Sequence, residues 1–190
     1  MIGDKSLEIR RQLFHLVTGV AIAFLSYFSL ITEKTLALIL VLGIILSYLS
    51  TRKKLPIISW FLKNFDRKFS LFPGEGAFFL VLGSFLALLL FQKNIALASI
   101  MILAVGDSLA TIFGLTFGST KFFKKSLEGS LGGFIPAFFA ALFFVNYKQA
   151  FLGTLVAMLL EAQEFRVKNL KLDDNILIPL GASLVMTLLW

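Results

Sequence analysis

Long apolar runs recur along the whole chain and are separated by short polar connections. Seven such runs cover residues 13–31, 35–50, 76–91, 94–113, 130–146, 149–163 and 175–190. A helix that crosses a bilayer needs about 20 apolar residues. Hydrophobic residues make up 58% of the chain and charged residues 15%, more apolar surface than a soluble core of this size can hide. We therefore expect a single all-α integral-membrane domain over 1–190, a bundle of about seven transmembrane helices.

Positive charges alternate between these connections. All of the 18 Lys and Arg residues except Lys34, Lys93 and Lys148 fall in the N-terminal segment and in every second connection, which lie on one side if all seven runs cross the membrane. By the positive-inside rule this side is cytoplasmic, so we expect a cytoplasmic N-terminus in a multi-pass protein. The net charge of +7 could suit nucleic acid. Its place between spans favours anionic headgroups or a phosphorylated substrate, and no nucleic-acid partner is expected.

The connection 51–75 carries an amphipathic pattern of its own. Its aromatic and aliphatic residues recur at helical spacing, which predicts a helix lying in the cytoplasmic membrane interface. A solvated loop with scattered aromatics is the alternative. The residues that define the pattern are Ile57, Phe61, Phe65, Phe69 and Phe72.

Residues 104–134 are the most informative segment. Asp107 interrupts an apolar run near its cytoplasmic end. A carboxylate at helix-centre depth costs about 2.5–3.5 kcal/mol, so it requires a partner or a function. Gly114 and Gly118 are expected to break this helix. Three lysines follow, at positions 121, 124 and 125, and would share a face if that stretch were helical.

Glu128 then precedes a glycine-rich start of the next run. An acid in an apolar helix, a lysine cluster and a glycine-rich helix start together suit a polyphosphate with its metal ion. Carboxylates bind Mg²⁺, lysines offset phosphate charge, and amides at a helix start bind oxygen atoms. Close helix packing would explain the glycines, and positive-inside topology the lysines, but neither explains Asp107 or Glu128. No GxxxxGK[ST] occurs, so this is not a Walker loop.

Two weaker signals lie on the same expected side. Arg11 and His15, the only His, are four residues apart and share a helix face, which suits a phosphate or headgroup contact. A packed or interfacial His is the alternative. The sequence Pro73-Gly74-Glu75-Gly76 opens the third run, where backbone amides could approach a ligand, but an ordinary turn is the favoured interpretation.

Acidic residues also flank the last connection. Glu161 lies near the end of the sixth run, and Asp173, Asp174 and Asn175 begin the seventh. Helix capping explains one Asp at such a position but not the whole group. These acids could complete a metal site with Asp107.

The 104–134 segment closely resembles the signature of the CTP-dependent lipid kinases, which include dolichol kinase, phytol kinase and the CTP-using diacylglycerol kinase. In that signature a G-D-S/A-x-A-x-x-x-G-x-x-x-G segment leads to K-S-x-E-G-S/T. The matching residues are Gly106-Asp107-Ser108, Ala110, Gly114, Gly118 and Lys125-Ser126-Leu127-Glu128-Gly129-Ser130. The opening Arg11 to His15 and the close Glu161, Asp173-Asp174-Asn175 and Ile178-Pro179 are similar as well. The resemblance spans most of the chain and looks like the minimal prokaryotic core of the family.

The resemblance implies transfer of the CTP γ-phosphate to the hydroxyl of a lipid alcohol at the cytoplasmic face, with Mg²⁺ as cofactor. The alcohol would be a polyprenol, dolichol, phytol or similar isoprenoid, or diacylglycerol. Candidate catalytic residues are Asp107, Glu128 and His15, and candidate Mg²⁺ ligands are Asp107, Asp173, Asp174 and Glu161. Candidate nucleotide contacts are Lys121, Lys124, Lys125, Ser126, Gly129, Ser130, Gly132, Gly133 and Arg11.

Two other functions stay open on the sequence. A phosphatidate cytidylyltransferase would share CTP, Mg²⁺ and acids at the membrane edge. A small transporter would place polar residues near the midplane in helices related by repeats, whereas the acids here cluster at one edge. The sequence does not indicate which alcohol is used or the oligomeric state.

Overall fold

The computed structural model describes residues 2–66, 70–163, 165–167 and 170–189. Over these residues the chain forms helices with two minimal strand pairs, so the prediction that helices build the fold is confirmed. The helices are α1 (Ile2–Tyr27), α2 (Glu33–Arg52), α3 (Pro56–Phe65), α4 (Glu75–Leu90), α5 (Lys93–Met101), η1 (Ile102–Asp107), α6 (Ser108–Phe117), α7 (Leu127–Ala141), α8 (Tyr147–Ala162) and α9 (Asp174–Leu188). The strands are β1 (Lys121–Phe122), β2 (Lys125–Ser126), β3 (Arg166–Val167) and β4 (Leu170–Lys171), paired antiparallel as β1–β2 and β3–β4.

Local sequence signals set several helix ends. The Ser126 hydroxyl accepts a hydrogen bond from the Gly129 amide at 3.1 Å and caps α7. Asp173 caps α9 in the same way, through the Asn175 amide at 3.0 Å. Such caps satisfy amides that have no partner inside the helix. Helix α6 ends at Phe117, directly before Gly118 as expected, but it continues through Gly114.

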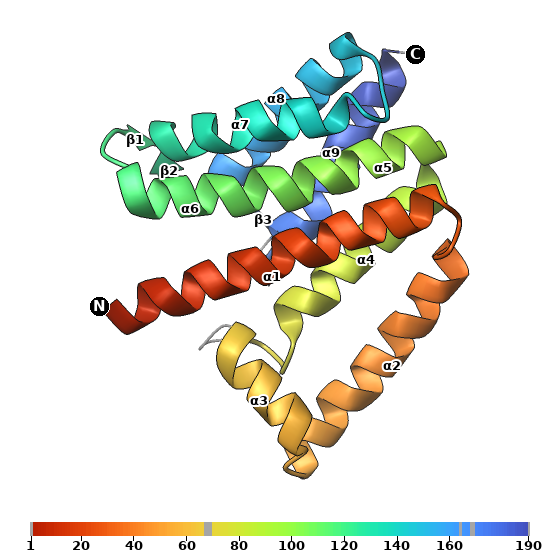
Figure 1. Cartoon of the computed structure of the whole chain (residues 1–190), viewed down its shortest axis with the longest axis vertical. Helices are drawn as coiled ribbons and strands as arrows, with labels where there is room; N and C mark the ends of the chain where they lie inside the picture. The colour runs from red at the N-terminus through yellow and green to blue at the C-terminus, as the bar shows by residue number, and fades with distance from the viewer. Residues whose placement is uncertain (1, 67–69, 164, 168–169, 190) are drawn as a thin grey trace.

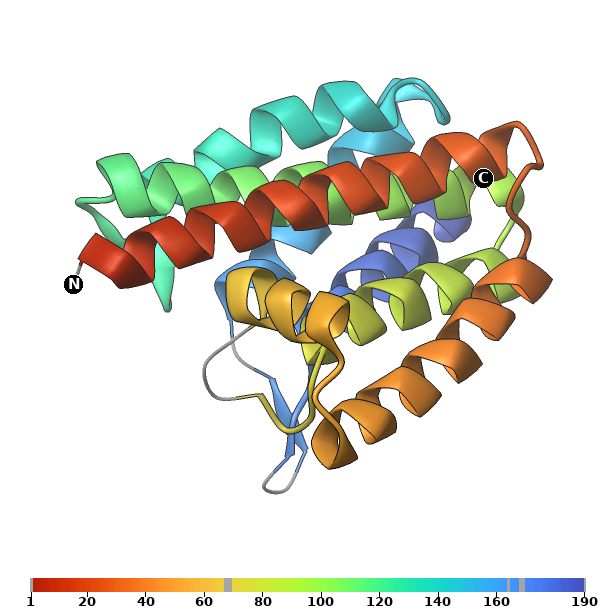
Figure 2. The same cartoon turned by 60° about the horizontal axis from the view of Figure 1, so that its bottom comes forward.

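The helix α5–η1–α6 runs through the middle of the fold. In both Figure 1 and Figure 2 it lies beside α1 and α7, and α1 contacts each of its three parts. Helix α7 packs on α6 and α8, and α9 packs on α8, α4 and α5. Helix α2 departs from this group and packs on α4. The N-terminus and the β1–β2 hairpin lie at the same end of the molecule (Figures 1 and 2).

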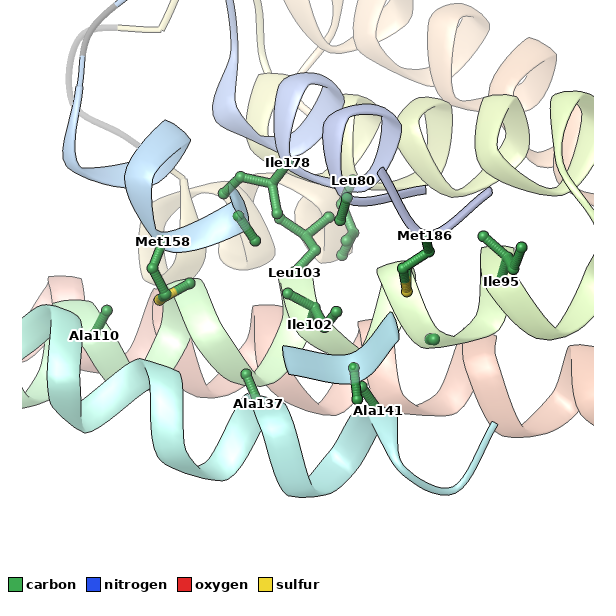
Figure 3. Close-up of a cluster of buried hydrophobic side chains, with 14 residues drawn as sticks. Leu80, Ile95, Ile102, Leu103, Ala110, Ala137, Ala141, Met158, Ile178 and Met186 are labelled. Carbon is green, nitrogen blue, oxygen red and sulfur yellow. The ribbon is translucent and has the colours of Figure 1, made fainter. Parts of the chain in front are cut away.

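The largest apolar core surrounds η1. Ile102 and Leu103 are fully buried there and meet Leu80 of α4, Met158 of α8 and Ile178 of α9 (Figure 3). Burying side chains of this size stabilises the fold by about 1.5–3 kcal/mol each. The core therefore fixes the position of η1, and with it the position of Asp107.

Glycines let the helices around this core approach closely. A Cβ on Gly133 of α7 would overlap the carbonyl oxygen of Gly106 and stand 2.7 Å from the Ala110 Cβ. A Cβ on Gly83 of α4 would overlap the Asn175 carbonyl oxygen of α9. Small residues at these positions are the usual means of close helix contact in membrane proteins.

The expectation of about seven transmembrane helices is wrong. Within the described residues only two helices are long and apolar enough to cross a membrane, α2 and the continuous helix Lys93–Phe117. The apolar helices α4, α7 and α9 have 16, 15 and 15 residues, so they measure roughly 24 Å at most, against a hydrocarbon core of about 30 Å. The seven-run count failed because it recorded apolar residues without their helix lengths.

The two candidate spans also differ in what covers them. The protein buries 72% of the most apolar window of Lys93–Phe117 but 11% of that of α2. A buried core helix passes the same composition test, so α2 is the more informative of the two. The cytoplasmic assignment of the N-terminus depended on the seven-run count and stays a proposal.

In the amphipathic segment 51–75 the described residues between α2 and α4 include the helix α3. Its residues Phe61 and Phe65 pack against Phe14 of α1, edge-to-face and tilted, with ring centroids 4.8 and 5.3 Å away. Ile57 and Trp60 point outward, 84% and 62% exposed. The helical pattern is thus present over 56–65, whereas Phe69 of the predicted pattern lies outside the described residues.

Candidate functional site

A cavity opens where α1, α3, α4, η1 and α9 meet. It holds about 560 Å³ of open space, including its mouth. Three residues predicted to act in function line it together: Arg11 and His15 from α1, and Asp107 from η1. The other lining residues are Gln12, Phe14, Phe61, Leu62, Phe65, Asp66, Gly74, Gly76, Ala77, Leu80 and Asn175.

Asp107 ends the π-helical segment η1. Such wider turns inside α-helices are rare and occur often at functional sites. Sequence reasoning identified the acid but not the π segment, because composition and periodicity carry no signal for it. The segment lies between two regular α-helical stretches, so the acid is presented from a locally irregular backbone inside a well-packed helix.

A buried ion pair lies near this acid. The Lys125 ammonium is 2.5 Å from Glu161 Oε1, and the Glu161 side chain is fully buried while that of Lys125 is 35% exposed. The same ammonium is 3.5 Å from the Thr111 hydroxyl of α6. The ion pair therefore joins the β1–β2 hairpin to the end of α8.

Lys125 is the most enclosed of the three candidate lysines. Burial alone would lower its pKa, but the negative charges of Asp107, Glu161 and Asp174 outweigh that effect and hold the pKa above its usual value. Lys125 is therefore a permanent cation surrounded by acids.

The carboxylates proposed as metal ligands fall into different settings. Asp173 is occupied by its cap on α9, whereas Asp174 and Asp107 both act electrostatically on Lys125 and Glu161. Glu161 Oε2 is buried without a hydrogen bond to any described residue. Among the described residues no three Asp, Glu or His side chains stand close enough to form a metal cage.

One mode of Mg²⁺ binding is compatible with these acids. Mg²⁺ is commonly held by one or two carboxylates, with substrate phosphates and water completing its shell. Asp107 and Asp174 are suited to this role. An ion bound entirely by protein groups is not supported by the geometry.

Glu128 anchors a loop. Its carboxylate accepts hydrogen bonds from the Ser119 hydroxyl at 2.6 Å and from the Ser119 and Thr120 amides at 3.0–3.2 Å. These contacts together lower the pKa of Glu128 to about 2, and the hydrogen bond from the Ser119 hydroxyl makes the largest contribution. A carboxylate so held is a weak base, so the arrangement favours anchoring over proton transfer.

The lysine segment is a hairpin and not a helix. Lys121 pairs with Ser126 and Phe122 with Lys125, so the face expected for the three lysines does not form. Lys121 and Lys124 are exposed, while Lys125 is half-buried. The Lys124 amide donates to the Ala162 carbonyl at 3.1 Å, which fixes the hairpin to the end of α8.

The glycine-rich start of α7 serves packing. Gly129 and Gly133 are buried against α6, and a Cβ on Gly132 would meet the Phe113 ring. Ser126 caps the helix, and the hydroxyl of Ser130 is buried without a hydrogen bond to a described residue. The amides proposed to bind phosphate thus belong to a tightly packed helix start.

Sequence reasoning missed Asp66 and described the contacts of Arg11 only in part. Asp66 accepts a hydrogen bond from the Gly74 amide at 2.9 Å and lines the cavity. Gly74 has a φ of +80°, a conformation that favours glycine. Arg11 pairs with Glu8, which also accepts a hydrogen bond from the Gln12 amide group at 3.0 Å. Asp66 lies outside every motif identified in the sequence, so a single sequence does not indicate that it lines the cavity.

These features define a helical protein with a charged cavity beside a buried lysine–glutamate pair. The chain is similar to the uncharacterized protein MJ1137 of Methanocaldococcus jannaschii, 36% identical over 186 residues that cover 94% of this chain and 92% of that protein. It is also similar to the uncharacterized protein RP860 of Rickettsia prowazekii, 30% identical over 198 residues that cover 97% and 96%. The chain belongs to the family of these two proteins. No family model and no solved structure matches it.

Proposed function

We propose that this protein is a CTP-dependent kinase that transfers the γ-phosphate to the hydroxyl of a membrane lipid alcohol. The observation that carries the proposal is the meeting of three distant motifs at one cavity, which Arg11, His15, Asp107 and Asn175 all line. Simple helix packing does not require the polar residues of α1, η1 and α9 to converge.

The residues suit phosphoryl transfer, which depends on positioning and on neutralising charge more than on covalent chemistry. Lys125 would bind phosphate oxygens, and Arg11 would add a second cation at the cavity wall. Asp107 and Asp174 would hold Mg²⁺, which supplies charge neutralisation to the phosphates when it is bound. His15 lines the same cavity as Asp107, and either group could take the proton of the attacking hydroxyl.

We also propose that the protein is an integral membrane protein with its N-terminus and cavity on the cytoplasmic side. Helix α2 supports membrane contact because it exposes large apolar residues along most of its length, among them Leu38, Val41 and Ile44. Exposed apolar surface of this extent is a sign of membrane or partner contact. CTP from the cytoplasm and a lipid hydroxyl from the headgroup layer could meet at such a cavity.

The test uses purified protein, Mg²⁺ and a panel of lipid alcohols in detergent micelles. We expect label from [γ-³²P]CTP to enter an alcohol, and Asp107→Asn to lower that rate by about 10²-fold or more. Glu33→Gln, an acid at the start of α2 that does not line the cavity, should leave it unchanged. Absence of labelled product for every alcohol, or full activity of Asp107→Asn, would overturn the proposal.

The position of the label separates the closest alternative. A cytidylyltransferase moves the α-phosphate with its CMP and releases pyrophosphate. Label from [α-³²P]CTP in the lipid product of phosphatidate would therefore favour that reaction over the kinase.

A further inference from the structure

An almost wholly apolar groove adjoins the charged cavity. It lies between α2, α3 and α4 and holds about 870 Å³ of open space, including its mouth. Figure 1 shows these three helices as the sides of a triangle, with α2 standing away from the rest of the bundle. Leu40 and Leu46 of α2, Ile58 of α3 and Val81 of α4 contribute to its walls.

The groove and the cavity share a wall. Phe61 and Leu62 of α3, Gly74, and Ala77 of α4 line both spaces. A ligand could therefore place one end among Arg11, His15 and Asp107 and the other end among aliphatic side chains. A molecule with a small polar head and an apolar tail fits this pair of spaces.

The few hydroxyls of the groove are already used within the protein. Ser47 donates to the Pro73 carbonyl at 2.8 Å, and Ser50 donates to the Ser47 carbonyl at 2.7 Å. Their donors are therefore not available to a polar ligand. A peptide segment would leave backbone groups without partners along these walls, whereas a hydrocarbon chain has none to satisfy.

We infer that the groove holds the hydrocarbon chain of the alcohol substrate, with its hydroxyl in the cavity beside Asp107. The inference rests on the proposed kinase function and adds to it a tail-binding site on α2, α3 and α4. A tail that enters from lipid or from a detergent micelle exchanges one apolar environment for another, so the groove selects among chains by how well they pack against its walls. Alcohols whose chains fill the groove should accordingly bind more tightly than short ones.

Gly43 allows a direct test. It lines the groove, and a Cβ built on it meets no atom within 4 Å. The Cβ of a larger residue therefore meets no obstacle there, and a Phe ring at this position would occupy part of the groove. Val41→Phe is the matched control, because Val41 is 54% exposed on α2 and does not line the groove.

For Gly43→Phe we expect the KM for geranylgeraniol to rise about tenfold or more, with kcat/KM for the short alcohol isopentenol unchanged. Val41→Phe should change neither. If the wild type phosphorylates geranylgeraniol and Gly43→Phe does so with the same KM, the tail site is refuted while the kinase function stands.

A binding readout makes the two proposals separable. Geranylgeraniol with a diazirine at its tail end should crosslink to Leu46 and Val81, and excess unlabelled geranylgeraniol should abolish this. If that labelling occurs but no alcohol is phosphorylated, the groove assignment stands and the kinase fails. If labelling is equal on the outward Val41 and Ile44 and resists competition, the probe reports boundary lipid and the inference is wrong.

Discussion

The ion pair between Lys125 and Glu161 can be tested quantitatively through Lys125→Met, which removes the charge and keeps a similar stem. Removal of one partner of a buried pair usually costs about 3–5 kcal/mol, because the remaining charge is left uncompensated. Here burial raises the pKa of Glu161 to about 7 even beside Lys125, so Glu161 can take up a proton when the lysine is removed. Lys125 is also 35% exposed, so water screens part of the attraction. We therefore expect the free energy of unfolding to fall by about 2–3 kcal/mol.

The double variant Lys125→Met/Glu161→Gln gives the decisive comparison. Because the second substitution replaces the remaining carboxylate with a neutral amide, the double variant should recover part of the loss, with a coupling energy of about 1–3 kcal/mol. Unfolding by denaturant in detergent micelles, followed by circular dichroism, measures both single variants and the double variant. Lys121→Met, an exposed lysine of the same hairpin, is the control and should stay within about 0.5 kcal/mol of wild type. Strict additivity, or a loss for Lys125→Met no larger than that of the control, would refute the reasoning.

Two further predictions concern the loop anchor and the helix contact. The folded-state pKa of Glu128, about 2, lies below its ordinary value of 4.5, so its stabilising contribution is present above about pH 4.5 and is lost as the pH falls toward 2. Hydrogen-exchange protection of the Ser119 and Thr120 amides should follow that window, and Glu128→Gln should lower it above about pH 4.5 but have little effect near pH 2; equal protection in the variant at neutral pH would contradict the anchor. Gly133→Ala should destabilise the fold by about 1–3 kcal/mol through overlap with α6, whereas Gly43→Ala should stabilise it by up to about 1 kcal/mol. Equal effects in the same unfolding assay would contradict the close packing.

The positions of the helices could be predicted from the sequence because local signals determine them. Apolar runs between polar connections correspond to the long helical stretches, and Ser126 and Asp173 cap helices whose starts were expected nearby. Helix α1 differs, since it begins at Ile2, well before the apolar run at residue 13. The prediction counted only the apolar part of this helix and left out the polar turns before residue 13.

The sequence could not show whether protein or lipid covers a given apolar surface. The run 94–113 reads as a membrane span, yet the protein itself buries most of it. The same limit applies to single residues. The sequence offered both Glu128 and Asp107 as candidate catalytic acids, but only tertiary contacts show Glu128 bound to a loop and Asp107 on a cavity wall. The lysine hairpin was missed because strands as short as β1 and β2 leave no periodic pattern.

The π-helical segment η1 has a geometric consequence for the helix Lys93–Phe117. A wider turn shifts the helix by up to one residue relative to a regular α-helix, and one residue is roughly 100° of rotation about the axis. Side chains of α6 are therefore rotated about the axis relative to those of α5, although α1 and α7 contact both stretches. A helical wheel drawn across residues 93–117 would misplace the side chains of α6, and Asp107 stands at the joint where the two phases meet.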